Sequence, residues 1–183
     1  KSATQSSNYN NDTVAALAVD GNINGDWSAG SVTHTLGETA PWWQVDLGAQ
    51  YSLAQVKLYN RTDCCRERLQ NFYVFVSARP FSSTDPAEIA ADPGVVSTFV
   101  GAATGAVPDL YDLTLQAVGR YVRVQLTQPD YLSLAEVQVF GQAPPPPTNV
   151  AAGKSATQSS NYNNDTVAAL ALDGNTNGDF AAG

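Results

Sequence analysis

Hydrophobic and polar residues alternate along several short stretches of the chain. In the clearest one, Val122, Val124 and Leu126 share one face, and this period of two predicts a half-buried β-strand. Arg123 and Gln125 fall on the opposite face. Similar patterns predict strands at 43–47, 54–59, 71–77 and 135–140. Because Asp-Gly and Asn-Gly turn pairs also punctuate the chain, we expect an antiparallel β-sandwich or jelly roll.

The first thirty residues return almost unchanged at the other end of the chain. Residues 154–183 repeat residues 1–30 except at four positions, and the segment between 142 and 153 contains four consecutive prolines. Such a run favours an extended, semi-rigid spacer. We therefore expect a domain over 1–141, a proline-rich linker over 142–153 and a truncated N-terminal part of a second tandem copy over 154–183.

The segment 148–153, with the sequence TNVAAG, precedes the second copy and has no counterpart before residue 1. We expect it to form a first strand that is donated to the first copy or to a neighbouring molecule. The second copy is too short to build a core of its own. Residues 148–183 are therefore a candidate for oligomer formation or strand exchange.

Charge and composition narrow the possible partners. The formal net charge is −8, so the field of the protein would repel the phosphates that dominate nucleic-acid affinity. No apolar run approaches the roughly 20 residues of a membrane-spanning helix. We expect no nucleic-acid partner and no membrane insertion. The chain has no Met and shows no signal peptide, as expected of a processed piece of a larger product.

Residues 60–69, with the sequence NRTDCCRERL, form a basic island in an acidic chain. The plainest interpretation is a solvated turn in which Asp63 and Glu67 neutralise the arginines. Cys64 and Cys65 are the only cysteines, and their spacing fits neither a zinc nor a redox motif. A disulfide between them would close too short a loop to stabilise the fold appreciably. A rigid apolar surface is the better explanation, with two reduced thiols as the alternative.

The distance in sequence from His34 to this island gives a specific motif. His34 followed by RTDCCRER at 61–68 resembles the F-type lectin (fucolectin) signature HX(26)RXDCCXER. The stretches PWWQVDLG at 41–48 and LAEVQVF at 134–140 resemble the wider discoidin-like, coagulation factor type C group. The resemblance covers about residues 1–141. It implies an all-β, eight-stranded antiparallel jelly roll that is not an enzyme and binds sugar at the loops of one end.

The resemblance also implies the ligand, which is terminal α-L-fucose on fucosylated, blood-group-type glycans and glycoproteins. It assigns sugar contacts to His34, Arg61, Arg68, Cys64, Cys65, Trp27 and Tyr9. The histidine and the arginines would hydrogen-bond the sugar, a disulfide of the two cysteines would pack against its ring, and the two aromatic residues would contact its methyl group unless they serve only in packing. Arginine offers fixed, charged donors, so three polar anchors would select an axial 4-hydroxyl and reject glucose and mannose.

A structural calcium ion is the second implication of the resemblance. Its ligands would be the side chains of Asp20, Asn22, Ser31 and Glu136 and carbonyl groups such as those of Leu17 and Ala135. Taken alone, residues 20–26 are equally typical of an Asx-rich turn. The second copy repeats Asp20 and Asn22 as Asp173 and Asn175 but lacks the other two side chains, so we expect it to bind neither calcium nor fucose.

Three other functions compete with that of a secreted or cell-surface lectin. A glycan-targeting module of a larger secreted enzyme or toxin would use the same chemistry. A discoidin-like adhesion domain would use apolar loop spikes rather than His34 with two arginines. A glycosidase would need two carboxylates, but this sequence shows no nucleophile signature. Two Asn-X-Thr sequons in the first copy, at Asn11 and Asn60, lead us to expect a bacterial source, because a glycan on Asn60 would crowd Arg61.

Overall fold

A computed structural model describes residues 1–178 of the chain. The chain divides into two compact units, Lys1–Pro144 and Pro145–Gly183, so the division falls inside the proline run. The last five residues of the expected second copy, 179–183, lie outside the described residues. Within the described part, no helix combines the length and the apolar character needed to cross a membrane.

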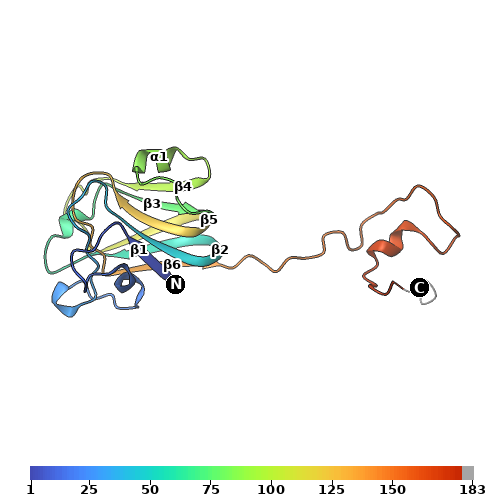
Figure 1. Ribbon diagram of the computed structural model, residues 1–183, viewed down its shortest axis with the longest axis horizontal. Helices are drawn as coiled ribbons and strands as arrows, with labels where there is room; N and C mark the ends of the chain where they lie inside the picture. The colour runs from blue at the N-terminus through green and yellow to red at the C-terminus, as the bar shows by residue number, and fades with distance from the viewer. Residues whose placement is uncertain (179–183) are drawn as a thin grey trace. The chain divides into compact units, whose positions relative to one another are not determined.

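The first unit is an antiparallel β-structure, shown in Figure 1. Its strands are β1 (Ser2–Gln5), β2 (Trp42–Tyr59), β3 (Phe72–Ser77), β4 (Val95–Val100), β5 (Leu110–Leu126) and β6 (Glu136–Gln142). They pair in the order β1-β2-β5-β3-β4, and β6 pairs with β2. A short helix, α1 (Pro86–Ala91), lies beside β3 and β4. The expected strands at 43–47 and 54–59 are joined in the single strand β2.

The long strands β2 and β5 fold the sheet over itself. β1 pairs with the first part of β2, whereas β6 pairs with its second part, from Ser52 to Tyr59. The register between β2 and β5 shifts between Asp46 and Tyr51, where Gly48 has a φ of 85°, a left-handed conformation that glycine adopts at little cost. Counting the two parts of β2 and of β5 separately gives the eight strands of the expected jelly roll, and the all-β antiparallel fold is confirmed.

One hydrophobic core fills the space inside the folded sheet. Val122, Val124 and Leu126 have no solvent exposure, so the predicted inner face of this strand is correct. Arg123 and Gln125 lie on the outer face, but they are also buried. The guanidinium of Arg123 lies between two aromatic rings, 4.6 Å from the ring centre of Trp42 and 4.5 Å from that of Phe81. Burial lowers the pKa of Arg123 to about 10.

The second unit has little regular structure. Among residues 145–178 the structure contains one 3-10 helix, η4 (Ala168–Leu172), and no strand. Residues 148–153 form a turn in the single chain rather than a strand: the side chain of Asn149 accepts from the N–H of Ala151, and its carbonyl accepts from the N–H of Ala152. Donation of this segment to the first copy or to a neighbouring molecule stays a prediction. β1 already supplies a first strand to the first unit. None of residues 145–178 is buried, in agreement with the expected lack of a core.

Candidate functional site

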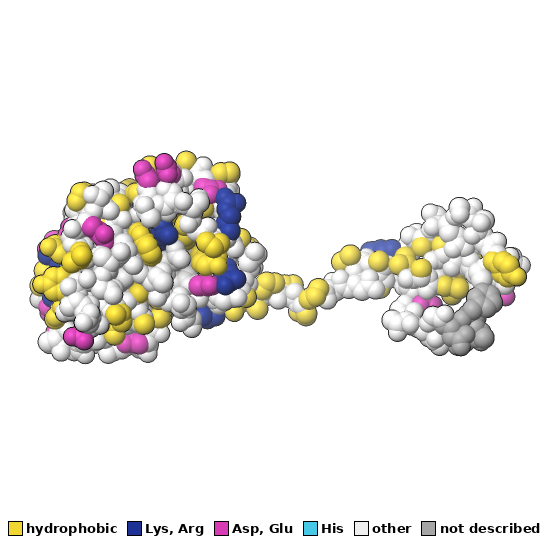
Figure 2. Space-filling view, in the orientation of Figure 1, with side chains coloured by type: hydrophobic (Ala, Val, Ile, Leu, Met, Phe, Trp, Pro, Cys, Tyr) yellow, Lys and Arg dark blue, Asp and Glu magenta, His cyan; other side chains and the backbone are white. Residues whose placement is uncertain are grey.

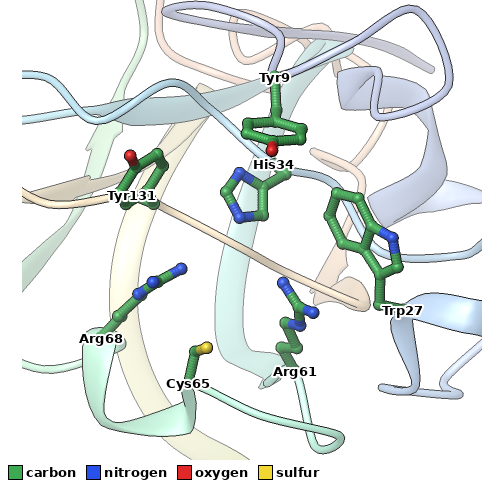
Figure 3. A pocket seen from close by; sticks show the side chains of 7 residues that line it. All are labelled: Tyr9, Trp27, His34, Arg61, Cys65, Arg68 and Tyr131. Atoms are coloured by element: carbon green, nitrogen blue, oxygen red, sulfur yellow. The ribbon is translucent and has the colours of Figure 1, made fainter.

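A cavity of about 420 Å³ opens among the loops that join the strands of the first unit. Figure 3 shows the side chains that line it, which are Tyr9, Trp27, His34, Arg61, Cys65, Arg68 and Tyr131. The structure therefore brings six of the seven predicted sugar contacts together. The seventh, Cys64, does not line the cavity, and Tyr131 was not predicted.

His34 lies at the centre of three aromatic rings in this cavity. Its ring centre is 4.9 Å from that of Tyr9, 5.0 Å from that of Trp27 and 5.3 Å from that of Tyr131. The residues on either side, Thr33 and Thr35, donate backbone hydrogen bonds to the segment before β6. This extended pairing, together with the ring contacts, leaves the His34 residue only 4% exposed.

The hydrogen bonding of His34 fixes which of its nitrogens carries the proton. Nδ1 lies 2.6 Å from the carbonyl oxygen of Thr35, and a carbonyl only accepts, so Nδ1 is the donor and Nε2 of the neutral ring is an acceptor. Burial lowers the pKa of His34 below its usual 6.5, and the charges of Arg61 and Arg68 lower it further, against a raising effect of the Thr35 hydrogen bond. At neutral pH the ring is therefore uncharged.

Arg61 is held in place by a carboxylate and a ring. Its Nε and Nη2 donate to the two carboxylate oxygens of Asp63 at 2.8 and 2.9 Å, and its guanidinium carbon lies 4.6 Å from the ring centre of Trp27. Asp63 also accepts from the backbone N–H of Trp27 at 3.1 Å. The hydrogen bonds from Arg61 hold the pKa of Asp63 well below its usual range, so this anchor stays charged.

Arg68 also lies between a carboxylate and a ring on the other side of the cavity, with a longer contact to its carboxylate. Its Nε lies 3.5 Å from Oδ1 of Asp130, and its guanidinium carbon lies 4.7 Å from the ring centre of Tyr131. The same Asp130 oxygen accepts from the backbone N–H of Tyr131 at 2.8 Å. Two arginines, each beside an aromatic ring, thus flank His34 (Figure 3), and each arginine is also paired with an aspartate.

The adjacent cysteines connect the two arginines. The structure joins Cys64 and Cys65 in a disulfide, so the alternative of two reduced thiols does not hold. Cys65 adopts a left-handed conformation with a φ of 58° and precedes the 3-10 helix η3 (Arg66–Arg68). Its carbonyl accepts from the N–H of Arg68 at 3.2 Å. This turn brings Arg68 back to the cavity, whereas Arg66 pairs with Asp109 at 2.8 Å and does not line it.

A run of Asx turns directly precedes Trp27 in the chain. The side-chain oxygens of Asp20, Asn22, Asn24 and Asp26 each accept from the backbone N–H two residues later, at 2.7, 3.1, 3.0 and 2.8 Å. The run leads into the 3-10 helix η2 (Trp27–Ala29). The sequence-based alternative of an Asx-rich turn is therefore correct for the conformation of this loop.

Gly25 fastens this loop to the segment that carries Arg61. Its carbonyl accepts from the N–H of Thr62 at 2.8 Å, and a Cβ at this position would lie 2.4 Å from the carbonyl oxygen of Asn60. Only glycine allows this approach. The side chain of Asn60 is 2% exposed and donates to the carbonyls of Arg66 and Pro108 at 2.9 and 3.2 Å.

The residues expected to hold calcium come together only in part. Glu136 is 5% exposed and accepts from the N–H of Gly21 at 3.3 Å. Burial raises the pKa of Glu136, and the nearby charge of Asp20 adds to the effect. Ser31 is buried and donates to the carbonyl of Asn24 at 2.6 Å, while Asn22 is exposed. Leu17 lies in the 3-10 helix η1 (Ala15–Val19), and Ala135 is buried beside Glu136.

Comparison with known families agrees with this arrangement of residues. The family model of the NedA-like, galactose-binding domain matches residues 17–124, which are more than half of the chain. Fucolectin-5 of Anguilla japonica is 34% identical over 133 residues, which make up 72% of this chain and 66% of the eel protein. The chain thus spans just under two thirds of the length of that relative.

Solved structures of similar sequence share the fold. The lectin domain of lectinolysin, complexed with Lewis B antigen, is 37% identical with a TM-score of 0.65, and the match covers 78% of this chain and 94% of that domain. A fucolectin from the serum of striped bass, Morone saxatilis, is 36% identical with a TM-score of 0.67, over 95% of this chain and 57% of that protein.

Proposed function

Because this chain belongs to the fucolectin family of NedA-like, galactose-binding domains, we propose that its cavity binds terminal α-L-fucose of fucosylated glycans. The observation that carries the proposal is the pair of anchored guanidinium groups on either side of one neutral imidazole. Two arginines supply donors in fixed directions. Nε2 of His34 supplies an acceptor between them, which suits a neighbouring pair of sugar hydroxyls.

Apolar surfaces complete the fit to a deoxy sugar. The rings of Tyr9, Trp27 and Tyr131 and the sulfur of Cys65 line the cavity between the polar groups. Fucose has a methyl group where most hexoses have a hydroxymethyl group, and the ring faces and the disulfide sulfur offer apolar contact that favours the methyl group. A mostly apolar lining with a few polar groups is typical of small-ligand sites, where the polar groups fix the orientation of the ligand.

The same groups account for stereochemical selection. A sugar whose hydroxyl points away from the arginines would leave buried donors unpaired, and an unpaired buried group costs about 1–3 kcal/mol. We therefore expect glucose and mannose to be rejected. No carboxylate is among the cavity-lining residues of the described chain, so the two-carboxylate chemistry of glycosidases has no support at this site.

A direct titration tests the proposal. Calorimetry with L-fucose should give one binding event per chain, because the second unit has no counterpart of Arg61, Arg68 or His34, with a dissociation constant in the micromolar to millimolar range. D-glucose and D-mannose at the same concentrations should give no heat beyond dilution. Equal binding of all three sugars would contradict the assignment.

We extend the proposal to a structural calcium ion near Asp20 and Glu136. Two carboxylates lie close together there, one of them buried, with no Lys or Arg paired to either among the described residues. A divalent cation would neutralise both. No group of three His, Cys, Asp or Glu side chains suited to a metal occurs in residues 1–178, so backbone carbonyls and an amide or hydroxyl oxygen would complete the shell, as calcium accepts.

Location and context follow from the same relatives. An extracellular site of action is supported by the similarity to a serum protein of striped bass. A glycan-targeting module within a larger secreted protein would use the same cavity, and multivalent presentation would strengthen weak single sites. The sequons do not support a bacterial source. The side chain of Asn60 is buried and hydrogen-bonded to two carbonyls, which leaves it inaccessible to glycosylation, and Fucolectin-5 is from an eel.

A further inference from the structure

A second cavity, of about 740 Å³, lies on the outer face of the sheet beside the start of α1. It shares no lining residue with the first cavity. The residues that determine its chemistry are Tyr73, Phe99, Thr39, Thr84, Asp85 and Thr127. Its size falls in the range of small-ligand sites, and the fucose contacts described above leave it unexplained.

Aromatic rings form one wall of this second cavity. Tyr73 and Phe99 face each other across β3 and β4 with ring centres 4.9 Å apart, and Tyr73 also stacks on the fully buried Phe75 at 4.9 Å and 15°. Phe99 is nevertheless 52% exposed. Phe99 is tilted by 49° to Tyr73 rather than stacked on it, so the two rings form an angled apolar wall, which Phe75 holds in place from behind. Rigid aromatic rings offer contact area at low entropic cost. The C–H face of a sugar ring matches such a surface.

The other residues that line the second cavity include polar side chains but no positively charged one. Oδ1 of Asp85 accepts from the N–H of Ala87 at 2.8 Å, and no donor among residues 1–178 reaches its second oxygen. The hydroxyl of Thr127 donates to the carbonyl of Asn71 at 2.8 Å, which leaves its oxygen as an acceptor. Because the lining has one carboxylate and no Lys or Arg, it would repel phosphate, sulfate and acidic sugars but would accept hydrogen bonds from neutral hydroxyl groups.

The walls are fixed before a ligand arrives. Gln125 is fully buried beneath the cavity, and its Nε2 donates to the carbonyls of Ala40 and Thr84 at 3.0 and 2.8 Å, both of which belong to lining residues. Within the described residues its Oε1 has no hydrogen-bond partner. One amide thus ties the two sides of the groove together, which reduces the cost of ordering them on binding.

The two cavities lie on either side of one pair of chain segments. Glu38 and Asp130 exchange backbone hydrogen bonds at 3.2 Å. Thr39 lines the second cavity and follows Glu38, while Tyr131 lines the first cavity and follows Asp130. We propose that the second cavity is a further saccharide site, which takes a neutral hexopyranose or N-acetylhexosamine unit stacked on Tyr73 and Phe99 with its hydroxyls directed at Asp85.

Amide chemical shifts of the full chain test this proposal. The protein is first saturated with L-fucose and then titrated separately with methyl β-D-galactoside, methyl β-D-glucoside and N-acetyl-D-glucosamine. At least one of the three should shift the amides of Tyr73, Ala87 and Phe99 in a saturable way, in the millimolar range. Phe99→Ala should weaken that binding about fivefold. Phe140→Ala, which removes another half-exposed ring on β6, should leave it unchanged.

Three outcomes would overturn the proposal. The first is no saturable shift at these amides with any of the three sugars, and the second is unchanged binding in Phe99→Ala. The third is a shift of the same amides on raising the protein concentration without sugar, which would make this face an interface between copies. The initial fucose titration reports on the amides of His34 and Arg61, so a failure of the fucose site is recognised separately.

Discussion

The guanidinium of Arg68 lies 4.7 Å from the ring centre of Tyr131, and one oxygen of Asp130 holds both residues. Arg61 and Trp27 repeat this relationship across the cavity. Each arginine is therefore oriented by an anion and a ring before any ligand binds. Such preorganisation lowers the entropic cost of binding, which matters for a ligand as small as one monosaccharide.

Replacing Arg68 should show whether this residue contacts the sugar directly or acts only through the positive charge of residues 60–69. Arg68→Ala removes a charged donor, and hydrogen bonds to charged groups contribute about 1.5–3 kcal/mol, so fucose affinity should fall roughly 10- to 100-fold. Arg66→Ala is the matched control, because Arg66 pairs with Asp109 and lies outside the cavity lining. Calorimetry measures both. Equal losses in the two variants would mean that the field of the basic island, rather than Arg68, attracts the ligand.

The protonation of His34 should set a lower pH limit for binding. Its pKa lies below the usual 6.5 because the ring is buried, so the ring is uncharged at and above neutral pH, and affinity should be flat there. As pH falls through the lowered pKa, Nε2 gains a proton and ceases to accept, so affinity should drop. Stability has the same direction: the unfolded state takes up the proton first, so the melting temperature should begin to fall below about pH 6.5. A His34→Asn variant should lose the affinity step.

Calcium should stabilise the first unit through Asp20. In calcium about 100-fold above its dissociation constant the stabilisation is about 2.7 kcal/mol, which raises the melting temperature by roughly 8 °C over that in EDTA. Asp20→Asn should abolish most of this difference. Asp173→Asn, at the equivalent position of the repeat, should leave it intact. Scanning calorimetry checks the prediction. An equal melting temperature in calcium and in EDTA would show that the first unit binds no stabilising calcium ion.

Gly25 should be intolerant of any side chain. Gly25→Ala places a Cβ 2.4 Å from a backbone oxygen, and relief of such overpacking costs about 1–3 kcal/mol. Because the displaced segment carries Arg61, fucose affinity should fall together with the melting temperature. Gly178→Ala is the control in the repeat, where nothing lies within 4 Å of the added atom. If both variants melt like the parent chain, the loop does not depend on this contact.

The strands of the core were predictable because their pattern is local. The alternation at 122–126 and the two halves of β2 follow directly from which residues face the core. The edge strands β1 and β4 were not predicted, since polar residues interrupt their apolar pattern. The burial of Arg123 also lay beyond the sequence pattern, because it depends on Phe81, a residue about forty positions away that covers the outer face.

The site was predictable where a spaced motif exists. His34, Arg61 and Arg68 were found because the motif that they form resembles the F-type lectin signature, and the structure places all three on one cavity. Tyr131 escaped notice because a single aromatic residue in a turn has no pattern of its own. The pairing of Asp130 with Arg68 is the signal that reveals it, and that pairing appears only when segments some sixty residues apart meet.

The Asx turns of residues 20–26 recur in the second unit, where Asn175 and Asn177 donate to the side chains of Asp173 and Asn175. No strand is present among the described residues of that unit, so the loop takes this shape from its own sequence. Contacts this local form much faster than the long-range pairing of a β-sandwich. We therefore expect the loop that leads to Trp27 to form early in folding, before the sheet and the segment that carries Arg61 and Arg68.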